Sequence, residues 1–141
     1  MALKNLPLET VNGWSRNTLM QTLAIECIEI GSDYLVARMP VDARTHQPAG
    51  LLHGGASMAL IESIGSMGSG LLLDDSREMP VGIEINANHV RAVTAGHVLG
   101  TGKLVHAGKR THLWQVDIHD EATGKLVCTG RLTVMVVPKA G

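Results

Sequence analysis

One long apolar segment limits what this chain can fold into more than any other feature of its sequence. Between Gly54 and Leu73 the residues GGASMALIESIGSMGSGLLL contain no Pro and a single charged residue, Glu62. Small residues alternate there with Leu, Ile and Met, which is typical of a helix that is buried on nearly every side. Five glycines lower its helix propensity, each interior one by about 1 kcal/mol relative to Ala. We therefore expect this helix to pack closely against a surrounding sheet or a second helix.

The chain before this helix contains a predicted hairpin. Residues 21–30 and 34–39 are rich in β-forming side chains and flank Gly31-Ser32-Asp33, a composition that favours a turn. The segment that precedes the hairpin is predicted to be short and partly helical. Residues 40–52 include two prolines and Gly50, and they are predicted to be irregular.

The chain after Pro80 reads as strands separated by turns that contain Gly or Asp. The predicted strands are residues 81–90, 97–105, 111–119 and 125–136. A hairpin, a central helix and a four-strand meander together predict an α+β fold, in which a mostly antiparallel sheet wraps around one helix.

The composition narrows the class of protein further. At 141 residues the chain fits one domain, residues 1–141, and it is small for an enzyme that encloses a large ligand, so self-association is expected. Aromatic residues make up 2% of the chain and Phe is absent, which argues against recognition of single-stranded nucleic acid by stacking. The formal net charge is -1 and the 12 Lys and Arg residues are scattered, so nucleic acid and an anionic membrane are poor partners.

Targeting signals and cysteine usage point to the cytoplasm. The first residues carry no apolar stretch long enough for a signal peptide, and nowhere do about 18 apolar residues run unbroken. Cys27 and Cys128 lie far apart in apolar surroundings and lack a CxxC spacing. We expect both to be reduced core residues rather than a disulfide, zinc ligands or a nucleophile.

The stretch from His46 to Ala56, HQPAGLLHGGA, is the most informative part of the chain. It brings polar side chains and bare glycine backbone to the start of an apolar helix, where unpaired N–H groups and a positive dipole end are found. Gly54 has no Cβ to block a ligand, so a carbonyl oxygen that gains negative charge could bind its N–H. The alternative is that Gly54-Gly55 only makes a tight turn into the helix.

Glu62 adds a reactive group to this picture. A lone carboxylate within an apolar helix is costly unless it reaches water, a partner or a substrate. Ser66 follows at i+4, on the same face of the helix. The competing explanations are a hydrogen bond from Ser66 to Glu62 at an exposed edge, or an ion pair with an Arg or His from a strand. So few charges occur between Gly50 and Leu73 that the residues favour a functional role.

Two other polar groups are weaker candidates. His89 ends an unusually polar strand tail, NANHVR, and it could be a ligand contact or, more commonly, a satisfied interfacial histidine. His106, Lys109 and Arg110 crowd a turn at Gly108, where donors could meet phosphate groups. Cations at a hairpin are usually only a solvated tip.

Several other chemistries are disfavoured by missing motifs. The chain contains no GxSxG, GxxxxGK, GxGxxG or HExxH, so the hydrolase elbow, the phosphate loop, the dinucleotide fold and the zincin site are set aside. The set of His53, Glu62 and His89 contains the side-chain types that bind metals, but their spacing does not match a metal-binding motif. No metal and no cofactor are expected.

The stretch from Gln47 to Ser66, QPAGLLHGGASMALIESIGS, closely resembles the hotdog-fold acyl-CoA thioesterases. The likeness is to the PaaI-like branch, which includes the 1,4-dihydroxy-2-naphthoyl-CoA, the enterobactin-pathway proofreading and the Arthrobacter-type 4-hydroxybenzoyl-CoA thioesterases. It continues through residues 82–91, GIEINANHVR, and into the final strands, so it covers nearly the whole chain. HGG followed by a Glu nine residues after its His is fairly specific to this branch.

This resemblance implies a hotdog fold, in which the sheet wraps the long helix, two subunits join their sheets, and dimers pair into a homotetramer. It also implies active sites at the dimer interface, with Gln47, His53 and Gly54 of one subunit facing Glu62 and Ser66 of the other. The expected reaction is hydrolysis of an acyl-CoA thioester, with an aryl acyl group preferred, and coenzyme A takes part only as a portion of the substrate and product.

The resemblance also assigns roles to single residues. Gly54 N–H would polarise the thioester carbonyl, and Gln47 and His53 would orient the thioester or the attacking water. Glu62 would either attack the carbonyl itself or deprotonate water, and the sequence leaves both open. The expected substrate-binding residues are those of the acyl side, Ser66 and His89, and the candidates for holding CoA, Gly82, Arg91, His106, Lys109 and Arg110.

Two other functions fit the same fold. A hotdog dehydratase or hydratase would also use a His and a carboxylate beside a helix start, but its His-Phe-Pro pattern needs a Phe that this chain lacks. A non-catalytic acyl-CoA-binding protein would have no need of Glu62, and it usually carries an added DNA-binding module for which 141 residues leave no room.

Overall fold

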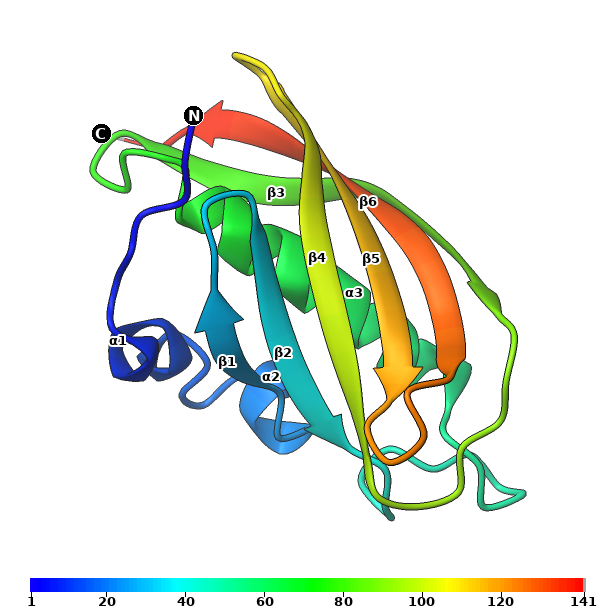
Figure 1. The fold of residues 1–141 in the computed structure, drawn as a ribbon. Coiled ribbons are helices and arrows are strands. Elements are labelled where there is room, and N and C mark those ends of the chain that lie inside the picture. Colours follow the sequence, from blue (N-terminus) through cyan, green and yellow to red (C-terminus); the bar gives the residue numbers. More distant parts are fainter. Residues whose placement is uncertain (141) are drawn as a thin grey trace.

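The helix that the sequence singles out lies in the concave face of a curved sheet. The computed structural model describes residues 1–140. In Figure 1 the strands curve around α3, and the two short helices lie beside β1, at one edge of the sheet. Within the described residues the elements are α1 (Leu8–Gly13), α2 (Leu19–Thr22), β1 (Glu26–Ile30), β2 (Tyr34–Pro40), α3 (Gly54–Gly70), β3 (Glu78–His89), β4 (His97–Ala107), β5 (Thr111–Asp120) and β6 (Leu126–Pro138).

The strand order is β1-β2-β4-β5-β6-β3, and every neighbouring pair is antiparallel. The predicted α+β architecture and its hotdog arrangement are confirmed. The predicted four-strand meander is wrong for β3, which pairs with β6 at the edge of the sheet while β4 pairs with β2. The connection after β3 explains this order, because Leu52 N–H donates to Val93 O (2.8 Å) and Val41 N–H donates to Gly96 O (2.8 Å). These bonds carry the chain across the end of the sheet to the far side of β5 and β6.

Glycines let α3 approach the sheet closely. A Cβ on Gly68 would lie 2.4 Å from the Trp114 ring, and one on Gly65 would lie 2.4 Å from Leu132 Cδ2. Both neighbours are fully buried core side chains. The propensity that these two glycines cost is therefore offset by dense packing of the helix on the sheet, as expected from the sequence.

The prediction that the helix is buried on nearly every side is wrong. The sheet covers one side of α3, and the other side carries exposed Glu62 between half-buried small residues and Met58. We call this surface the open face of α3, and its residues are Met58, Ala59, Glu62, Ser63 and Ser66. The sequence misleads here because the open face carries a single charge and otherwise consists of Ser, Ala and Met, residue types that also occur on the buried face. The larger side chains Leu60, Ile61 and Ile64 lie only on the buried face. The helix also ends at Gly70, with Leu71 as its C-cap, rather than at Leu73.

The N-terminal part confirms the expected short helices and hairpin, with one correction. Residues 21–25 do not belong to the first strand, because Thr18 caps α2 through its side chain (Met20 N–H to Oγ1, 3.2 Å) and Ala24 ends it with φ 54°. Cys27 and Cys128 are buried and free, as predicted. Across residues 1–140, no helix is both long and apolar enough to cross a membrane.

Candidate active site

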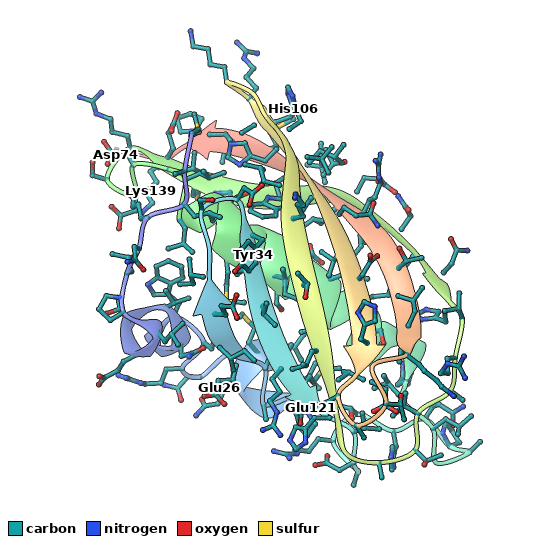
Figure 2. All side chains as sticks on the ribbon, viewed as in Figure 1. Glu26, Tyr34, Asp74, His106, Glu121 and Lys139 are labelled. Carbon is teal, nitrogen blue, oxygen red and sulfur yellow. The ribbon has the colours of Figure 1, made fainter. Side chains whose placement is uncertain are left out.

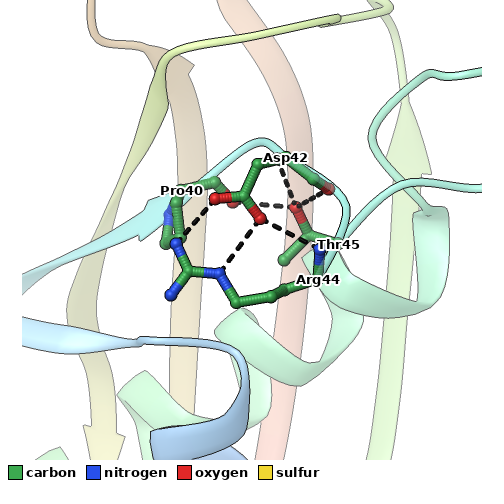
Figure 3. Close-up of polar contacts among 4 residues, drawn as sticks. All are labelled: Pro40, Asp42, Arg44 and Thr45. Carbon is green, nitrogen blue, oxygen red and sulfur yellow. Dashed lines mark hydrogen bonds and ion pairs between the residues drawn. The ribbon is translucent and has the colours of Figure 1, made fainter.

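A tight turn after β2 anchors the loop that leads to α3. The Asp42 carboxylate accepts hydrogen bonds from Arg44 N–H (2.9 Å) and from the Arg44 guanidinium (2.6 Å), as Figure 3 shows. These contacts lower the pKa of Asp42 to about 2. Thr45 is buried, and its hydroxyl donates to Pro40 O (2.8 Å). The turn fixes the position of Thr45, whose carbonyl in turn accepts from His53 N–H (2.8 Å).

Gln47 lies in a second turn of the same loop. Its N–H donates to Leu51 O (2.8 Å), its carbonyl accepts from Gly50 N–H (2.9 Å), and Gly50 has φ 80°, a conformation that favours glycine. The side-chain oxygen of Gln47 accepts from Ala49 N–H. This leaves the side-chain NH₂ of Gln47 as the donor that a ligand could use.

His53 is the N-cap of α3. Its Nδ1 accepts a hydrogen bond from Gly55 N–H at 2.7 Å, so in the neutral ring the proton lies on Nε2. Ala56 N–H and Ser57 N–H both donate to His53 O. The N–H of Gly54 has no acceptor among the described residues, and it is the one donor of the first turn that a ligand could reach without breaking a bond.

The start of α3 opens into a cavity of about 420 Å³. His89 reaches it from the end of β3, and its Nε2 lies 2.9 Å from the position that a Cβ on Gly54 would take. The cavity therefore depends on glycine at position 54. It brings together four of the predicted site residues, Gln47, Gly54, His89 and Arg91, and it is also lined by Ser57, which the sequence did not single out.

Glu62 lies elsewhere in the same chain. Its Oε2 is 2.5 Å from the position of a Cβ on Gly82, so the carboxylate lies against the backbone of β3. No ion pair holds Glu62 anywhere in residues 1–140, and it does not accept a hydrogen bond from Ser66 there. Eight residues of helix separate Glu62 from Gly54, about 12 Å along the axis, so the two groups cannot meet on one small group within one chain.

Ser66 lines a separate, mainly apolar cavity of about 350 Å³ under the N-terminal segment. Trp14 and Met20 form its outer wall and Ser63 is part of its floor. No motif points to Trp14 or Met20, because both come from the short N-terminal helical segments, whose packing on α3 has no local sequence pattern.

The hairpin cations lie at the other end of the sheet. Figure 2 labels His106 beside the β4–β5 hairpin, whereas Glu121, in the turn at the opposite end of the strands, marks the end at which α3 begins. Lys109 and Arg110 form the tip of this hairpin and are exposed. The structure therefore does not bring His106, Lys109 and Arg110 to the Gly54 cavity of the same chain. Within the described residues no cluster of His, Cys, Asp or Glu side chains could hold a metal ion.

The arrangement offers oxyanion stabilisation at one end of α3 and a carboxylate on its open face. A bare helix N-terminal N–H favours a carbonyl oxygen that acquires negative charge, and a carboxylate can attack a carbonyl or deprotonate water. These are the parts that acyl transfer to water requires.

Comparisons with known proteins support the same chemistry. Residues 49–127 match the family model described as the thioesterase superfamily. The chain is 46% identical over 134 residues to the 1,4-dihydroxy-2-naphthoyl-CoA hydrolase of Escherichia coli strain K12, which covers 95% of this chain and 97% of that protein. It is also 46% identical over 134 residues to the proofreading thioesterase EntH of Cronobacter turicensis, with 95% and 96% covered.

Solved structures agree with the sequence relatives. The crystal structure of a mutant of thioesterase PA1618 from Pseudomonas aeruginosa superposes with a TM-score of 0.94 at 42% identity, and covers 98% of this chain and 99% of that one. The similarity thus includes the N-terminal helices, the loop before α3 and all strands.

Proposed function

The chain belongs to the thioesterase superfamily, and on that premise we propose that it hydrolyses acyl-CoA thioesters, preferably aryl-CoA, in active sites shared between two copies of the chain. Thioester hydrolysis itself follows from the family and from the named relatives. The observation that supports the location of the site most directly is the Gly54 N–H, which opens into a cavity and has no acceptor in residues 1–140.

In this proposal the thioester carbonyl points at Gly54 N–H. Negative charge that develops on the carbonyl oxygen is stabilised by this donor and by the positive end of the α3 dipole. His53 Nε2–H and the Gln47 NH₂ are two further donors beside it, and they orient the thioester or the attacking water. His89 stands over Gly54 and limits the space for the acyl group.

Glu62 supplies the reactive carboxylate. Acting as a base, it takes a proton from water while the water oxygen bonds to the carbonyl carbon. The tetrahedral intermediate then collapses, the C–S bond breaks, and the proton passes from Glu62 to the thiolate, which leaves the free acid and CoA. Acting as a nucleophile, Glu62 bonds to the carbonyl carbon itself and expels the thiolate, and water then hydrolyses the mixed anhydride.

The distance of about 12 Å between Gly54 and Glu62 on one helix is the reason for a shared site. Two α3 helices that run antiparallel would bring Gly54 of one chain to the partner's Glu62. The free edge of β3 allows this pairing, because its 12 residues have no neighbouring strand on that side within the described chain. Pairing of two β3 edges would also cover both open faces of α3.

We also propose that two such dimers pack into a tetramer. Five large apolar side chains, Met79, Val81, Ile83, Val105 and Met135, are exposed on strands β3, β4 and β6. Val81 and Met135 are direct cross-strand partners, so at least these two lie on the same face of the sheet. A second pair of chains packed on this face would remove the apolar surface from water.

CoA is expected to bind near Arg91, which lines the Gly54 cavity. His106, Lys109 and Arg110 lie at the far end of the sheet, so they would serve a site of another subunit, where Arg and Lys can bind phosphate. Gly82 would let the thioester pass close to β3 beside Glu62. The reaction needs no metal and no cofactor. A cytoplasmic location is also part of the proposal.

The test replaces Glu62 by Gln and follows release of free thiol from benzoyl-CoA. We expect the rate to fall by about 10²- to 10⁴-fold with the assembly intact, because the carboxylate is lost and the shape is kept. Glu26→Gln, an exposed glutamate on β1, is the matched control and should be unchanged. Unchanged turnover in Glu62→Gln would remove this residue from the mechanism. A dehydratase would release no free thiol, and a binding protein would bind benzoyl-CoA without turnover.

Gly54 offers a second, sharper pair of variants. Proline is favoured at the first position of a helix, and its ring replaces the N–H, whereas Ala adds a Cβ but keeps the N–H. We expect Gly54→Pro to lose roughly 10²- to 10³-fold more rate than Gly54→Ala. Equal rates in these two variants would contradict the role of the Gly54 N–H.

Mixed assemblies test whether the site is shared. Glu62→Gln and Gly54→Pro chains are each inactive alone, but a mixed dimer would contain one intact site, so an equal mixture should recover about a quarter of the wild-type activity. No recovery in an assembly that is shown to be mixed would contradict the shared site.

A further inference from the structure

We propose that Trp14 is a specificity-determining residue: its indole forms the wall of the acyl pocket and selects flat aryl groups over straight alkyl chains. This inference rests on the proposed function and names the group that distinguishes acyl substrates. The pocket is the cavity of about 350 Å³ between the N-terminal segment and α3, here called the acyl cavity. The residues of the acyl cavity that carry the argument are Trp14, Met20, Ser63, Ser66, Gly70 and Met79.

The acyl cavity adjoins the neighbourhood of Glu62. A second hollow of about 350 Å³ contains Glu62 and Ala59, and Met20 and Ser63 line both hollows. A carbonyl placed at Glu62 would therefore have its acyl group beside Ser63. On the open face of α3 only serine side chains lie between Glu62 and the acyl cavity, and Met20 borders both hollows from the N-terminal segment.

The floor of the acyl cavity has the length of an aryl group. Ser66 and Gly70 follow Glu62 at i+4 and i+8 on the same side of α3, about 6 and 12 Å along the axis. One or two fused rings attached to a carbonyl at Glu62 would span the first of these distances and reach toward the second. A Cβ on Gly70 would lie 3.6 Å from Trp14 Cζ3, so the indole stands over Gly70 at the far end of the floor.

Trp14 is placed to meet a ligand. Its side chain is 44% exposed, whereas Trp114, the other tryptophan, is fully buried. The position is fixed, because Asn12 Nδ2–H donates to Cys27 O (2.9 Å) and Asn12 Oδ1 accepts from Cys27 N–H (2.8 Å), which ties α1 to β1. An exposed indole that stands over a floor of small residues gains an aromatic contact when a flat ring stacks on it.

The experiment compares kcat/KM for 2-naphthoyl-CoA with kcat/KM for hexanoyl-CoA. We expect Trp14→Leu to lower this aryl-to-alkyl ratio roughly three- to tenfold, the usual worth of one aromatic stacking contact. Trp14→Phe keeps a flat ring and should stay within about twofold of wild type. Leu8→Ala, which removes a half-exposed side chain of the same helix outside the acyl cavity, is the control and should leave the ratio unchanged. A folded Trp14→Leu protein with an unchanged ratio would overturn the inference.

A second measurement does not depend on how Trp14→Leu folds. Since Trp114 is buried, quenching of indole fluorescence by acrylamide reports Trp14. In the Glu62→Gln protein, saturating benzoyl-CoA should reduce this quenching and CoA alone should not. Equal quenching with both ligands would contradict contact between Trp14 and the acyl group. Failure of the proposed function looks different, because wild-type protein would then release no thiol from any thioester.

Discussion

The two edges of the sheet are built in opposite ways. At one edge β1 has five residues, is interrupted by a bulge between Cys27 and Glu29, and has its Cys27 backbone groups bonded to the Asn12 side chain. At the other edge β3 has 12 residues, and no strand of residues 1–140 lies beyond it. Ile83 on β3 is 51% exposed, whereas Ile28 on β1 is 38% exposed.

The difference shows where the chain can meet a copy of itself. Both edge strands contain a bulge, and that of β3 lies between Gly82 and Glu84, so the edges differ in length and in occupied backbone groups. A short strand with occupied backbone groups is a poor template for another strand, but a long free strand with exposed apolar side chains is a good one. The open face of α3, with Glu62, lies beside the free edge and not beside the blocked one, because Glu62 lies against Gly82 of β3. The proposed self-association and the proposed shared site therefore fall on the same side of the molecule.

The largest expected effect comes from placing a charge at each edge. Ile83→Lys should prevent association through β3 and lower thioester hydrolysis at least a hundredfold, because Gly54 and Glu62 then belong to no common site. Ile28→Lys makes the same change at the blocked edge and should alter neither property. Sedimentation and thiol release measure both effects. A fully active monomer of Ile83→Lys would show that one chain is sufficient.

A smaller effect tests why the β1 edge is blocked. Asn12→Ala leaves Cys27 N–H and C=O without their partner, so the free energy of unfolding should fall by about 1–3 kcal/mol. The matched change on the other edge strand is Asn86→Ala, whose exposed side chain bonds only to Glu84, and it should stay within about 0.5 kcal/mol of wild type. Urea denaturation measures both variants, and equal losses would mean that the Asn12 contacts do not stabilise the β1 edge.

The smallest expected effect concerns the pH dependence of stability, and it comes from a buried histidine that lies away from both edges of the sheet. His112 is 1% exposed and its Nδ1 lies 2.8 Å from Ser69 Oγ; burial, followed by nearby His106, lowers its pKa from the ordinary 6.5. Above about pH 6.5 both folded and unfolded chains hold this ring neutral, and below it the unfolded chain takes up a proton that the folded chain resists. Stability should therefore fall as the pH drops below 6.5, and His112→Gln should lose part of this acid dependence, by a few degrees in Tm at most. Identical pH dependence in the variant and wild type would contradict the prediction.

The sequence predicts which segments form helices and strands better than it predicts which strands pair. Apolar periodicity and turn residues locate α3 and every strand, because these signals are local. The pairing of β3 with β6 was missed, because it depends on where residues 90–96 cross the end of the sheet, and that crossing is fixed by single backbone bonds from Val41 and Leu52. The exposure of Glu62 was missed for a related reason, since composition alone does not say which side of a helix the sheet covers.

The candidate site was predictable in part. The stretch around Gly54 identifies the helix start, because glycine and polar residues are common there for local reasons. The structure places Gln47, Gly54 and His89 around one cavity. Trp14 could not be identified, because its contact with Gly70 joins residues that are distant in sequence and share no motif. The part that needs two chains, the meeting of Gly54 with Glu62, stays a prediction.

The cap at His53 has a consequence for how protons can move. Because one ring nitrogen is committed to holding the first turn of α3, the imidazole has a fixed tautomer and presents a single outward N–H. It can point that hydrogen at a substrate, but it cannot accept a proton there and pass it on without breaking the turn. The Glu62 carboxylate alone would then act as acid and base. His53 would serve as a hydrogen-bond donor of fixed orientation and not as a proton shuttle.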